Sequence, residues 1–243
     1  MTSGRRRDND TPLRVVLDAR KLGDGGIGVY IENVICGLDL AARAAVQVTA
    51  IISPDRRASL PEIQHGARLQ VVEDAASKYS LDELTKMPRR INNELRQADV
   101  FHAPHYTLPY SLGIPSVVTT HDIIHVTNPD SLLHRLLGSF LIRSALKRAT
   151  AAITVSEASA QEIKRHFGKS DIGVVYNALR DEFFAANQNG NVSNEICFVH
   201  PALEAGGQTS NTSAFLLFVA DKRPHKGLDV LYPAWLRLRV QDP

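Results

Sequence analysis

The chain has 243 residues, of which 44% are hydrophobic and 22% are charged, and these are ordinary values for a globular protein. Its 28 lysines and arginines nearly balance its 26 aspartates and glutamates, so the net charge of +2 gives no reason to expect a nucleic-acid partner. The two cysteines are too few for a disulfide framework, and we therefore expect a reducing, cytoplasmic setting.

The first twelve residues are basic but lack the apolar core of a signal peptide, so they are expected to form a solvated tail. No later segment has the roughly 18 consecutive apolar residues that a membrane-spanning helix needs. The sequence therefore predicts a protein that is dissolved or that lies on a membrane surface.

Short apolar runs alternate with helix-like segments from residue 13 onward. The run LRVVLDAR (13–20) is typical of a buried strand, and residues 26–43 repeat apolar side chains at helical spacing. Further strands are predicted over 46–53, 68–74, 99–104, 115–122, 151–156 and 172–177. Helices are predicted over 80–98, with an interruption at Pro88, and over 131–150 and 156–168. Apolar strands alternating with helices predict an α/β fold, a Rossmann-like doubly wound parallel sheet covered on both faces.

The composition changes after Asn177, where the segments 186–195 and 204–213 are rich in Gly, Asn and Ser. The alternation of strand and helix then restarts over 214–239. We therefore divide the chain into a disordered tail (1–12), an N-terminal domain (13–185), a linker (186–213) and the truncated start of a second domain (214–243).

The stretch KLGDGGIGVYIENV contains the spacing G-x-G-x-x-G of a dinucleotide-binding turn. Five residues separate the apolar strand from Gly23, however, and no acidic residue ends the next strand, so a nicotinamide cofactor is disfavoured. Two interpretations stay open. Gly25, Gly26 and Gly28 either let a phosphate approach the amides of a helix N-terminus, or they form a tight turn that packs closely.

Two predicted strands end in polar and aromatic residues. His121 and Asp122 follow one strand, where a histidine can donate to a sugar hydroxyl and a carboxylate can orient it. His105 and Tyr106 follow another, with side chains of the kind that line sugar sites. The alternative is that these histidines only make hydrogen bonds within their loops. Nine histidines form no helical pair with a third ligand, so no metal site is expected.

The predicted helix 131–150 carries an apolar stripe together with several arginines and lysines. We expect the stripe to face the core, and docking on anionic lipid, as peripheral contact at the inner face of a membrane, is the alternative. The stripe consists of Leu132, Leu133, Leu136, Leu137, Phe140 and Leu141.

The segment DKRPHKG places Arg223 and Lys226 between a predicted strand and a helix, where their charges suit a phosphate. A solvated basic turn is the alternative. The helix that follows contains Pro233, which removes a backbone donor and costs on the order of 3 kcal/mol in a helix interior.

Taken in order, six segments resemble the retaining glycosyltransferases of family 4, which have the GT-B fold. They are GGIGVYIENV, DVFHAPHYTLP, IPSVVTTHDII, AAITVSEASAQEI, IGVVYNALRDEFF and FLLFVADKRPHKGLDVL. The resemblance implies transfer of a sugar, mannose-like as one option, from a nucleotide-diphosphate donor to a glycan or lipid-linked acceptor in polysaccharide biosynthesis. It implies neither a cofactor nor a metal.

The resemblance also assigns roles to residues. Gly25, Gly26 and Gly28 match the glycine loop of the family near the donor phosphates, and Lys226 matches the lysine that neutralises the diphosphate, with Arg223 beside it. We therefore expect these five residues to bind the donor.

The strand-end residues take the remaining roles. His121 matches the family histidine that contacts the donor sugar, and we place it with Asp122 as the catalytic pair. His105 and Tyr106 are expected on the acceptor side. Because most nucleotide contacts of the family lie in the second domain, we expect the isolated chain to be an incompetent transferase. A non-catalytic carbohydrate- or partner-binding module is the alternative function, and a nicotinamide-dependent oxidoreductase is a third.

Overall fold

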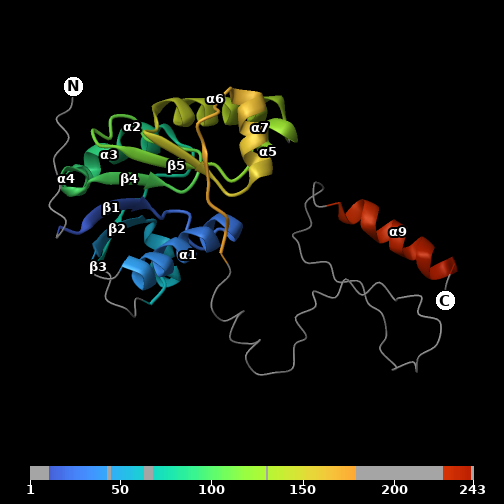
Figure 1. Ribbon diagram of the computed structural model, residues 1–243, viewed down its shortest axis with the longest axis horizontal. Coiled ribbons are helices and arrows are strands. Elements are labelled where there is room, and N and C mark those ends of the chain that lie inside the picture. The colour runs from blue at the N-terminus through green and yellow to red at the C-terminus, as the bar shows by residue number, and fades with distance from the viewer. Residues whose placement is uncertain (1–10, 43–44, 63–67, 130, 179–226, 242–243) are drawn as a thin grey trace. The chain divides into compact units, whose positions relative to one another are not determined.

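The computed structural model describes residues 11–42, 45–62, 68–129, 131–178 and 227–241 (Figure 1). The chain falls into two units, Met1–Arg180 and Asp181–Pro243. The predicted linker 186–213 and the strand predicted to open the last segment lie outside the described residues. The first unit therefore carries the sheet on which the site is built.

Seven parallel strands form a single sheet in the order β3-β2-β1-β4-β5-β6-β7. The strands are β1 (Leu13–Asp18), β2 (Val46–Ile52), β3 (Arg68–Glu73), β4 (Val100–Ala103), β5 (Ser116–Thr119), β6 (Ala151–Thr154) and β7 (Gly173–Val174). The predicted α/β class and the doubly wound parallel sheet are confirmed. The strand order reverses between β1 and β4, which is where a doubly wound sheet binds its ligands.

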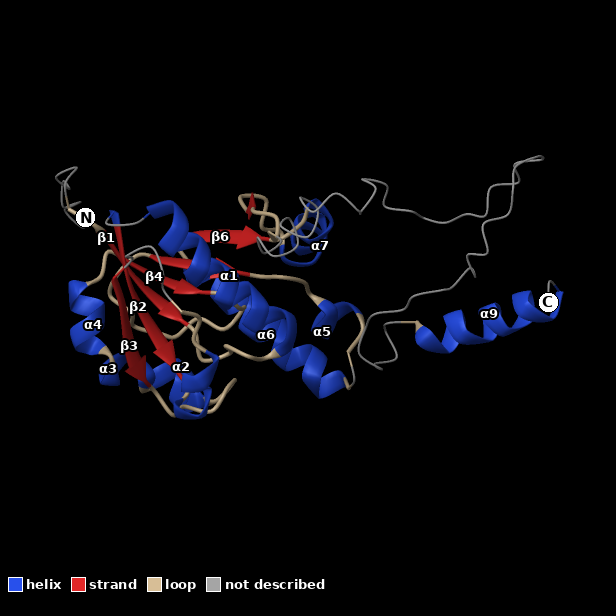
Figure 2. Ribbon diagram, turned by 90° about the horizontal axis from the view of Figure 1, so that it is seen from below, coloured by secondary structure: helices blue, strands red, loops and turns tan. Residues whose placement is uncertain are grey.

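Helices lie on both sides of this sheet (Figures 1 and 2). They are α1 (Gly25–Ala42), α2 (Leu81–Thr85), α3 (Met87–Arg90), α4 (Asn92–Gln97), α5 (Ile124–Thr127), α6 (Leu132–Arg148) and α7 (Glu157–Phe167), with the 3-10 helix η2 (Pro54–Ser59). The helix predicted over 80–98 is interrupted near Pro88 as expected, but it divides twice, into α2, α3 and α4. Pro88 lacks a backbone N–H and lies in the first turn of α3. The sequence pattern also missed α5 and η2, which are too short to show a period.

Two hydrophobic clusters fill the two sides of the sheet. Successive strand residues point to opposite faces, so Val16 and Leu17 belong to different clusters. The Leu17 cluster includes Ile31 of α1, and the Val16 cluster includes Met87 of α3 and Ile142 of α6. The sheet is therefore covered from both sides, as its continuous apolar strands predict.

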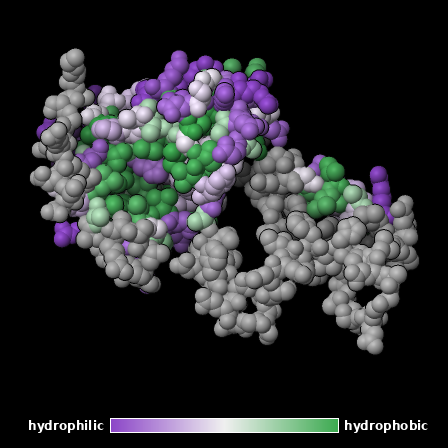
Figure 3. All heavy atoms as spheres, in the orientation of Figure 1, coloured by the Kyte–Doolittle hydropathy of each residue, from purple (hydrophilic) through white to green (hydrophobic). Residues whose placement is uncertain are grey.

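On the side of the sheet that α1 covers, the strands β4, β5 and β6 are less completely buried. Strand register places Val100, Val117 and Ile153 on this side, where all three are only half-buried. Figure 3 shows hydrophobic residues gathered across the middle of the first unit. Polar side chains of the same strands lie next to these residues and contribute to the site described below.

The apolar stripe of α6 faces solvent, so the predicted core-facing stripe is wrong for five of its six residues. Leu132, Leu133, Leu136, Leu137 and Phe140 are between 46% and 72% exposed. The core instead receives Leu141, Ile142, Ala145 and Leu146, together with Gly138. Gly138 explains the orientation, because a Cβ there would lie 3.1 Å from the Cβ of His125 in α5, and its absence lets α6 approach α5 closely on that side.

The described part of the second unit is one helix, α9 (Leu228–Gln241), which contains Pro233. It begins directly after Gly227, whose φ of +72° is a left-handed conformation that glycine adopts readily. None of the helices in the described ranges combines the length and the apolar character needed to cross a membrane.

Candidate functional site at the strand ends

The loops that follow β1, β4 and β5 meet at one edge of the sheet, because parallel strands all end on the same side. The β1 loop leads into α1, the β4 loop contains His105 and Tyr106, and the β5 loop contains His121 and Asp122. The predicted residues of the first unit therefore share one edge of the sheet.

The glycine loop is an open helix N-terminus. Gly25 has a φ of +49°, and an added Cβ at Gly25 or Gly26 would meet no described atom within 4 Å apart from its neighbours in the chain and the backbone of its own helix. The amide of Gly28 donates to the carbonyl of Asp24 at 3.0 Å, whereas the first amides of any α-helix have no partner within it. Such an end, with its positive dipole, favours an anion.

Gly28 has a different role from Gly25 and Gly26, since it is buried and packs against the loop itself. A Cβ on Gly28 would lie 2.6 Å from the amide nitrogen of Gly23 and 2.9 Å from its carbonyl carbon. Those are backbone atoms, so they cannot rotate away as a side chain can. The tight-turn interpretation therefore holds for Gly28, and the phosphate interpretation stays a prediction for Gly25 and Gly26.

His121 lies against α1, directly after β5. Its ring meets the ring of Tyr30 edge to face, with centroids 4.7 Å apart. Its Nε2 lies 3.0 Å from the carbonyl oxygen of Pro104, which can only accept, so Nε2 carries the proton and Nδ1 of the neutral ring is an acceptor. Burial lowers the pKa of His121, although the Pro104 bond and the charge of Asp122 partly oppose this.

Asp122 is exposed and holds the loop together through its carboxylate, which accepts from the amide of Ile124 at 3.0 Å. On the other side, Ser159 of α7 donates to the carbonyl of His121 at 2.8 Å. Ser159 also donates its amide to the Ser156 hydroxyl, so Ser156 is the N-cap of α7. The backbone of His121 is thus held from both sides.

A short polar chain on the α1 side of the sheet supports Tyr30. The Nε2 of His102 lies 2.9 Å from the hydroxyl of Thr119, and that hydroxyl lies 3.3 Å from the hydroxyl of Tyr30. Burial lowers the pKa of His102 to about 4, and the neighbouring His105 and His121 act in the same direction. His102 is therefore neutral at neutral pH.

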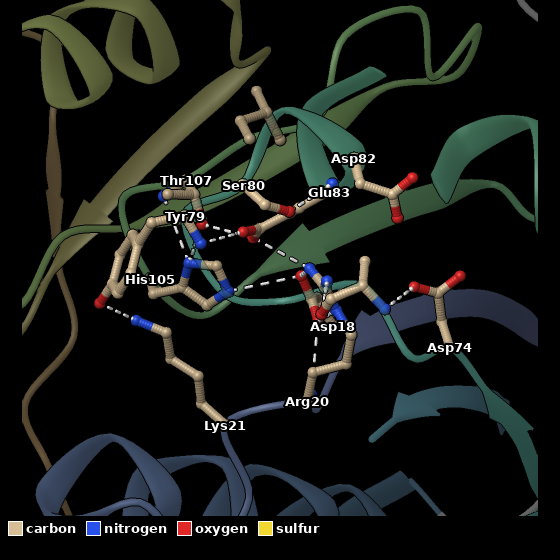
Figure 4. A network of polar contacts seen from close by, with 12 residues as sticks. Asp18, Arg20, Lys21, Asp74, Tyr79, Ser80, Asp82, Glu83, His105 and Thr107 are labelled. Atoms are coloured by element: carbon tan, nitrogen blue, oxygen red, sulfur yellow. Dashed lines mark hydrogen bonds and ion pairs between the residues drawn. The ribbon is translucent and has the colours of Figure 1, made fainter. Parts of the chain in front are cut away.

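A closed ring of five polar side chains lies beside these groups, where β1 and β4 end (Figure 4). Its members are Asp18, Arg20, Glu83, Thr107 and His105, and all five are buried. Arg20 binds Asp18 through two hydrogen bonds of 2.8 and 2.7 Å and binds Glu83 at 2.9 Å. Glu83 accepts from Thr107 at 2.9 Å, the amide of Thr107 donates to Nδ1 of His105 at 3.2 Å, and Nε2 of His105 donates to Asp18 at 3.3 Å.

The charges in this ring stabilise one another. Burial alone would raise the pKa of Asp18, but the charge of Arg20 and the hydrogen bonds from His105 and Arg20 hold that pKa well below its usual range. Burial lowers the pKa of His105, and Asp18 opposes this only in part. His105 is therefore a neutral ring inside the cluster, and the pair of carboxylates depends on Arg20.

Asp18, Glu83 and His105 also form the one group in the described parts of the chain that could hold a metal ion, with ligand atoms within 4.8 Å of one another. Arg20 already lies between the two carboxylates and supplies the positive charge that they require. These donors therefore fit a guanidinium rather than a divalent cation.

Tyr106 lies at the rim of the ring, in a small aromatic cluster. It stacks on Tyr79 with centroids 5.8 Å apart, and Nζ of Lys21 lies 4.1 Å from the centre of the Tyr79 ring and bonds its hydroxyl. Burial raises the pKa of Tyr106, and the nearby Tyr79 adds to this. Tyr106 is half-buried whereas His105 is fully buried, so only Tyr106 lies where a ligand could touch it.

The structure brings the predicted residues His121, Asp122, His105, Tyr106 and the glycines to one edge of the sheet, but sequence reasoning missed the residues that hold them. Arg223 and Lys226 lie outside the described residues. The missed residues include Asp18 and Arg20, whose position directly after a buried strand was the available signal. Glu83 gave no signal, because nothing in a polar helix indicates that one acidic residue is buried.

The sequence model of Glycosyltransferase Family 4 matches residues 24–183, from the glycine loop to beyond β7. No curated protein matches the chain. Among solved structures, HepE from Anabaena, determined in complex with UDP and glucose, is 16% identical with a TM-score of 0.46. The alignment covers 73% of this chain and 50% of HepE, so the chain spans about half the length of that protein. Because the family match covers well over half of its residues, the chain belongs to glycosyltransferase family 4.

Proposed function

We propose that this chain is the acceptor-side part of a retaining glycosyltransferase that moves a sugar from a nucleotide-diphosphate donor to a glycan or lipid-linked acceptor. The observation that carries the proposal is the contact between Tyr30 of α1 and the ring of His121. It brings the strand-end histidine to the helix whose open N-terminus begins at Gly25 and Gly26. An imidazole and a set of backbone amides can therefore act on one ligand.

The helix N-terminus serves the departing diphosphate. When the bond between the sugar and the phosphate breaks, negative charge develops on the phosphate oxygen, and fixed donors aimed at that oxygen lower the barrier. The exposed backbone at Gly25 and Gly26 admits a phosphate to the first amides of α1. In this proposal Lys226 and Arg223 add positive charge to the same group.

His121 orients the donor sugar. Because its Nε2 donates to Pro104, its Nδ1 can accept a hydrogen bond from a sugar hydroxyl, and the lowered pKa keeps the ring neutral for this purpose. Asp122 supports His121 through its charge and by fixing the turn. On the acceptor side Tyr106 contacts the substrate, whereas the buried His105 positions the β4 loop.

The glycine loop offers a test that separates binding from folding. Gly26→Asp places a carboxylate in the first turn of α1, where it favours the helix dipole and repels a phosphate. With a panel of UDP- and GDP-sugars in ligand-detected NMR, we expect the wild-type chain to bind weakly and Gly26→Asp to bind at least tenfold more weakly. Its unfolding midpoint should be unchanged or higher.

The matched control is Gly37→Ala, a substitution in the same helix at a position where an added Cβ meets no described atom within 4 Å. It should leave binding of the sugar nucleotides unchanged. Equal binding by wild type and Gly26→Asp would contradict the assignment of the glycine loop. Binding of oligosaccharides without binding of any sugar nucleotide would favour a non-catalytic carbohydrate-binding module instead.

A further inference from the structure

The N-terminal half of α6 presents an apolar face that nothing in the described chain covers. Leu132, Leu133, Leu136, Leu137 and Phe140 lie within an arc of about 140° of the helix and extend over roughly 12 Å of its axis. Leu133 is 72% exposed and Phe140 is 59% exposed. Five large apolar side chains gathered in this way mark an interaction site more often than a free surface.

Basic residues continue the same face toward the C-terminal end of α6. At 100° per residue, Arg143 and Lys147 point in the same direction as the apolar side chains, and both are exposed. Together with Lys169 they line one pocket beside Phe167, and the Arg143 guanidinium lies 5.6 Å from the centre of the Phe167 ring. Three positive side chains in one pocket suit a phosphate group.

The arginines and lysines of α6 give the whole helix a positive charge. From Leu132 to Arg148 the helix contains four arginines and lysines and no acidic residue. Long basic side chains keep their charged ends at the level of lipid phosphates while apolar side chains beside them enter the acyl region. A protein partner would need acidic groups placed against the pocket, whereas an anionic bilayer supplies them everywhere.

We propose that this face, from Leu132 to Lys147, docks the chain on an anionic lipid surface, with the five apolar side chains inserted and the pocket of Arg143, Lys147 and Lys169 holding a lipid phosphate. This inference is independent of the transfer chemistry proposed above.

Sedimentation with vesicles tests the proposal. The wild-type chain is incubated with vesicles of phosphatidylcholine alone and of phosphatidylcholine mixed with phosphatidylglycerol. We expect sedimentation with the mixed vesicles only. Leu133→Ser with Leu136→Ser should lower the partition coefficient at least tenfold, and Arg143→Gln with Lys147→Gln should lower it about fivefold for each charge removed.

The matched control is Leu81→Ser in α2, which replaces a leucine that is 78% exposed on another helix. It should partition as the wild type does. All of these side chains are exposed, so the variants should keep the unfolding midpoint of the wild type, and this is checked in parallel by urea denaturation.

Two results would overturn the proposal. One is sedimentation that does not depend on phosphatidylglycerol or is unchanged in the double leucine variant. The other is a dimer in light scattering that the double leucine variant converts to a monomer, because a second copy of the chain would then cover the face.

Discussion

Two polar regions lie at the same edge of the sheet and differ in how their groups are paired. In the ring of Asp18, Arg20, Glu83, Thr107 and His105, hydrogen bonds and ion pairs join each side chain to the next, and burial excludes water. At the glycine loop, Gly25 and Gly26 are exposed, and His121 is half-buried with its Nε2 bonded to the carbonyl of Pro104. Buried charge therefore marks the scaffold here, and open backbone marks the candidate site.

The two regions are nevertheless joined through the backbone. Arg20 and the glycine loop belong to the same connection between β1 and α1, and His105 follows Pro104, whose carbonyl accepts from His121. The closed ring thus holds the loops that carry the open site. The predictions below test whether the first region acts through stability and the second through binding.

Arg20→Met should have the largest effect, because it leaves Asp18 and Glu83 buried without their cation. We expect the free energy of unfolding to fall by about 3–5 kcal/mol, measured by urea denaturation. The control is Arg57→Met, which removes an exposed ion pair with Glu73, whose side chains are 67% and 42% exposed, and should cost about 0–1 kcal/mol. A similar small loss in both variants would show that the ring contributes little.

Gly28→Ala should come next, because the new methyl group meets the backbone of Gly23. We expect a loss of about 1–3 kcal/mol in the free energy of unfolding. The same substitution at Gly37, in the same helix, should raise stability by about 0.5–1 kcal/mol. If both alanines stabilise the protein, Gly28 has no packing role and belongs with the open glycines.

Mild acid should destabilise the protein through its histidines. Burial lowers the pKa of His102 to about 4 in the folded state, so the unfolded chain binds the proton first and stability falls as the pH drops toward that value. Between about pH 6.5 and 5.5, His102 alone should cost about 1 kcal/mol in urea denaturation. The lowered pKa values of His105 and His121 act in the same direction.

His102→Gln keeps a partner for Thr119 and should flatten this pH profile, whereas His166→Gln, an exposed histidine of α7, is the control. Asp18 affects the stability of the protein in a different pH range. Because its folded pKa is lowered, its contribution is complete above about pH 4 and is lost only below that value. A profile that is flat from neutral pH down to about pH 4 would contradict the buried neutral histidines.

Tyr30→Phe should have the smallest effect on stability, because it removes one hydroxyl contact of 3.3 Å and keeps the ring against His121. We expect a loss of about 0.5–1 kcal/mol and unchanged binding of sugar nucleotides in NMR. Tyr30→Ala should weaken that binding, because the ring no longer orients His121. Equal binding by both variants would show that Tyr30 does not position the histidine.

The leucines of α6 show where sequence reasoning reached its limit. The spacing of Leu132, Leu136 and Phe140 shows correctly that they share one side of a helix, but it cannot tell whether that side meets the core or solvent. The tertiary packing decides this, since Leu141, Ile142, Ala145 and Leu146 enter the core and Gly138 permits the close approach to His125 on that side. The same limit applies to Glu83, whose burial depends on Arg20, 63 positions earlier in the chain.

The sequence by itself determined the α/β class, the parallel sheet, the seven described strands and the family, because these follow from local periodicity and from motifs that keep their order. It also located the residues that end each strand, since an apolar run and its polar end are neighbours in the chain. Only the tertiary structure decided which of those residues are buried in hydrogen-bonded pairs and which are exposed to a ligand. Burial and pairing depend on contacts between segments far apart in the sequence, and no local pattern records them.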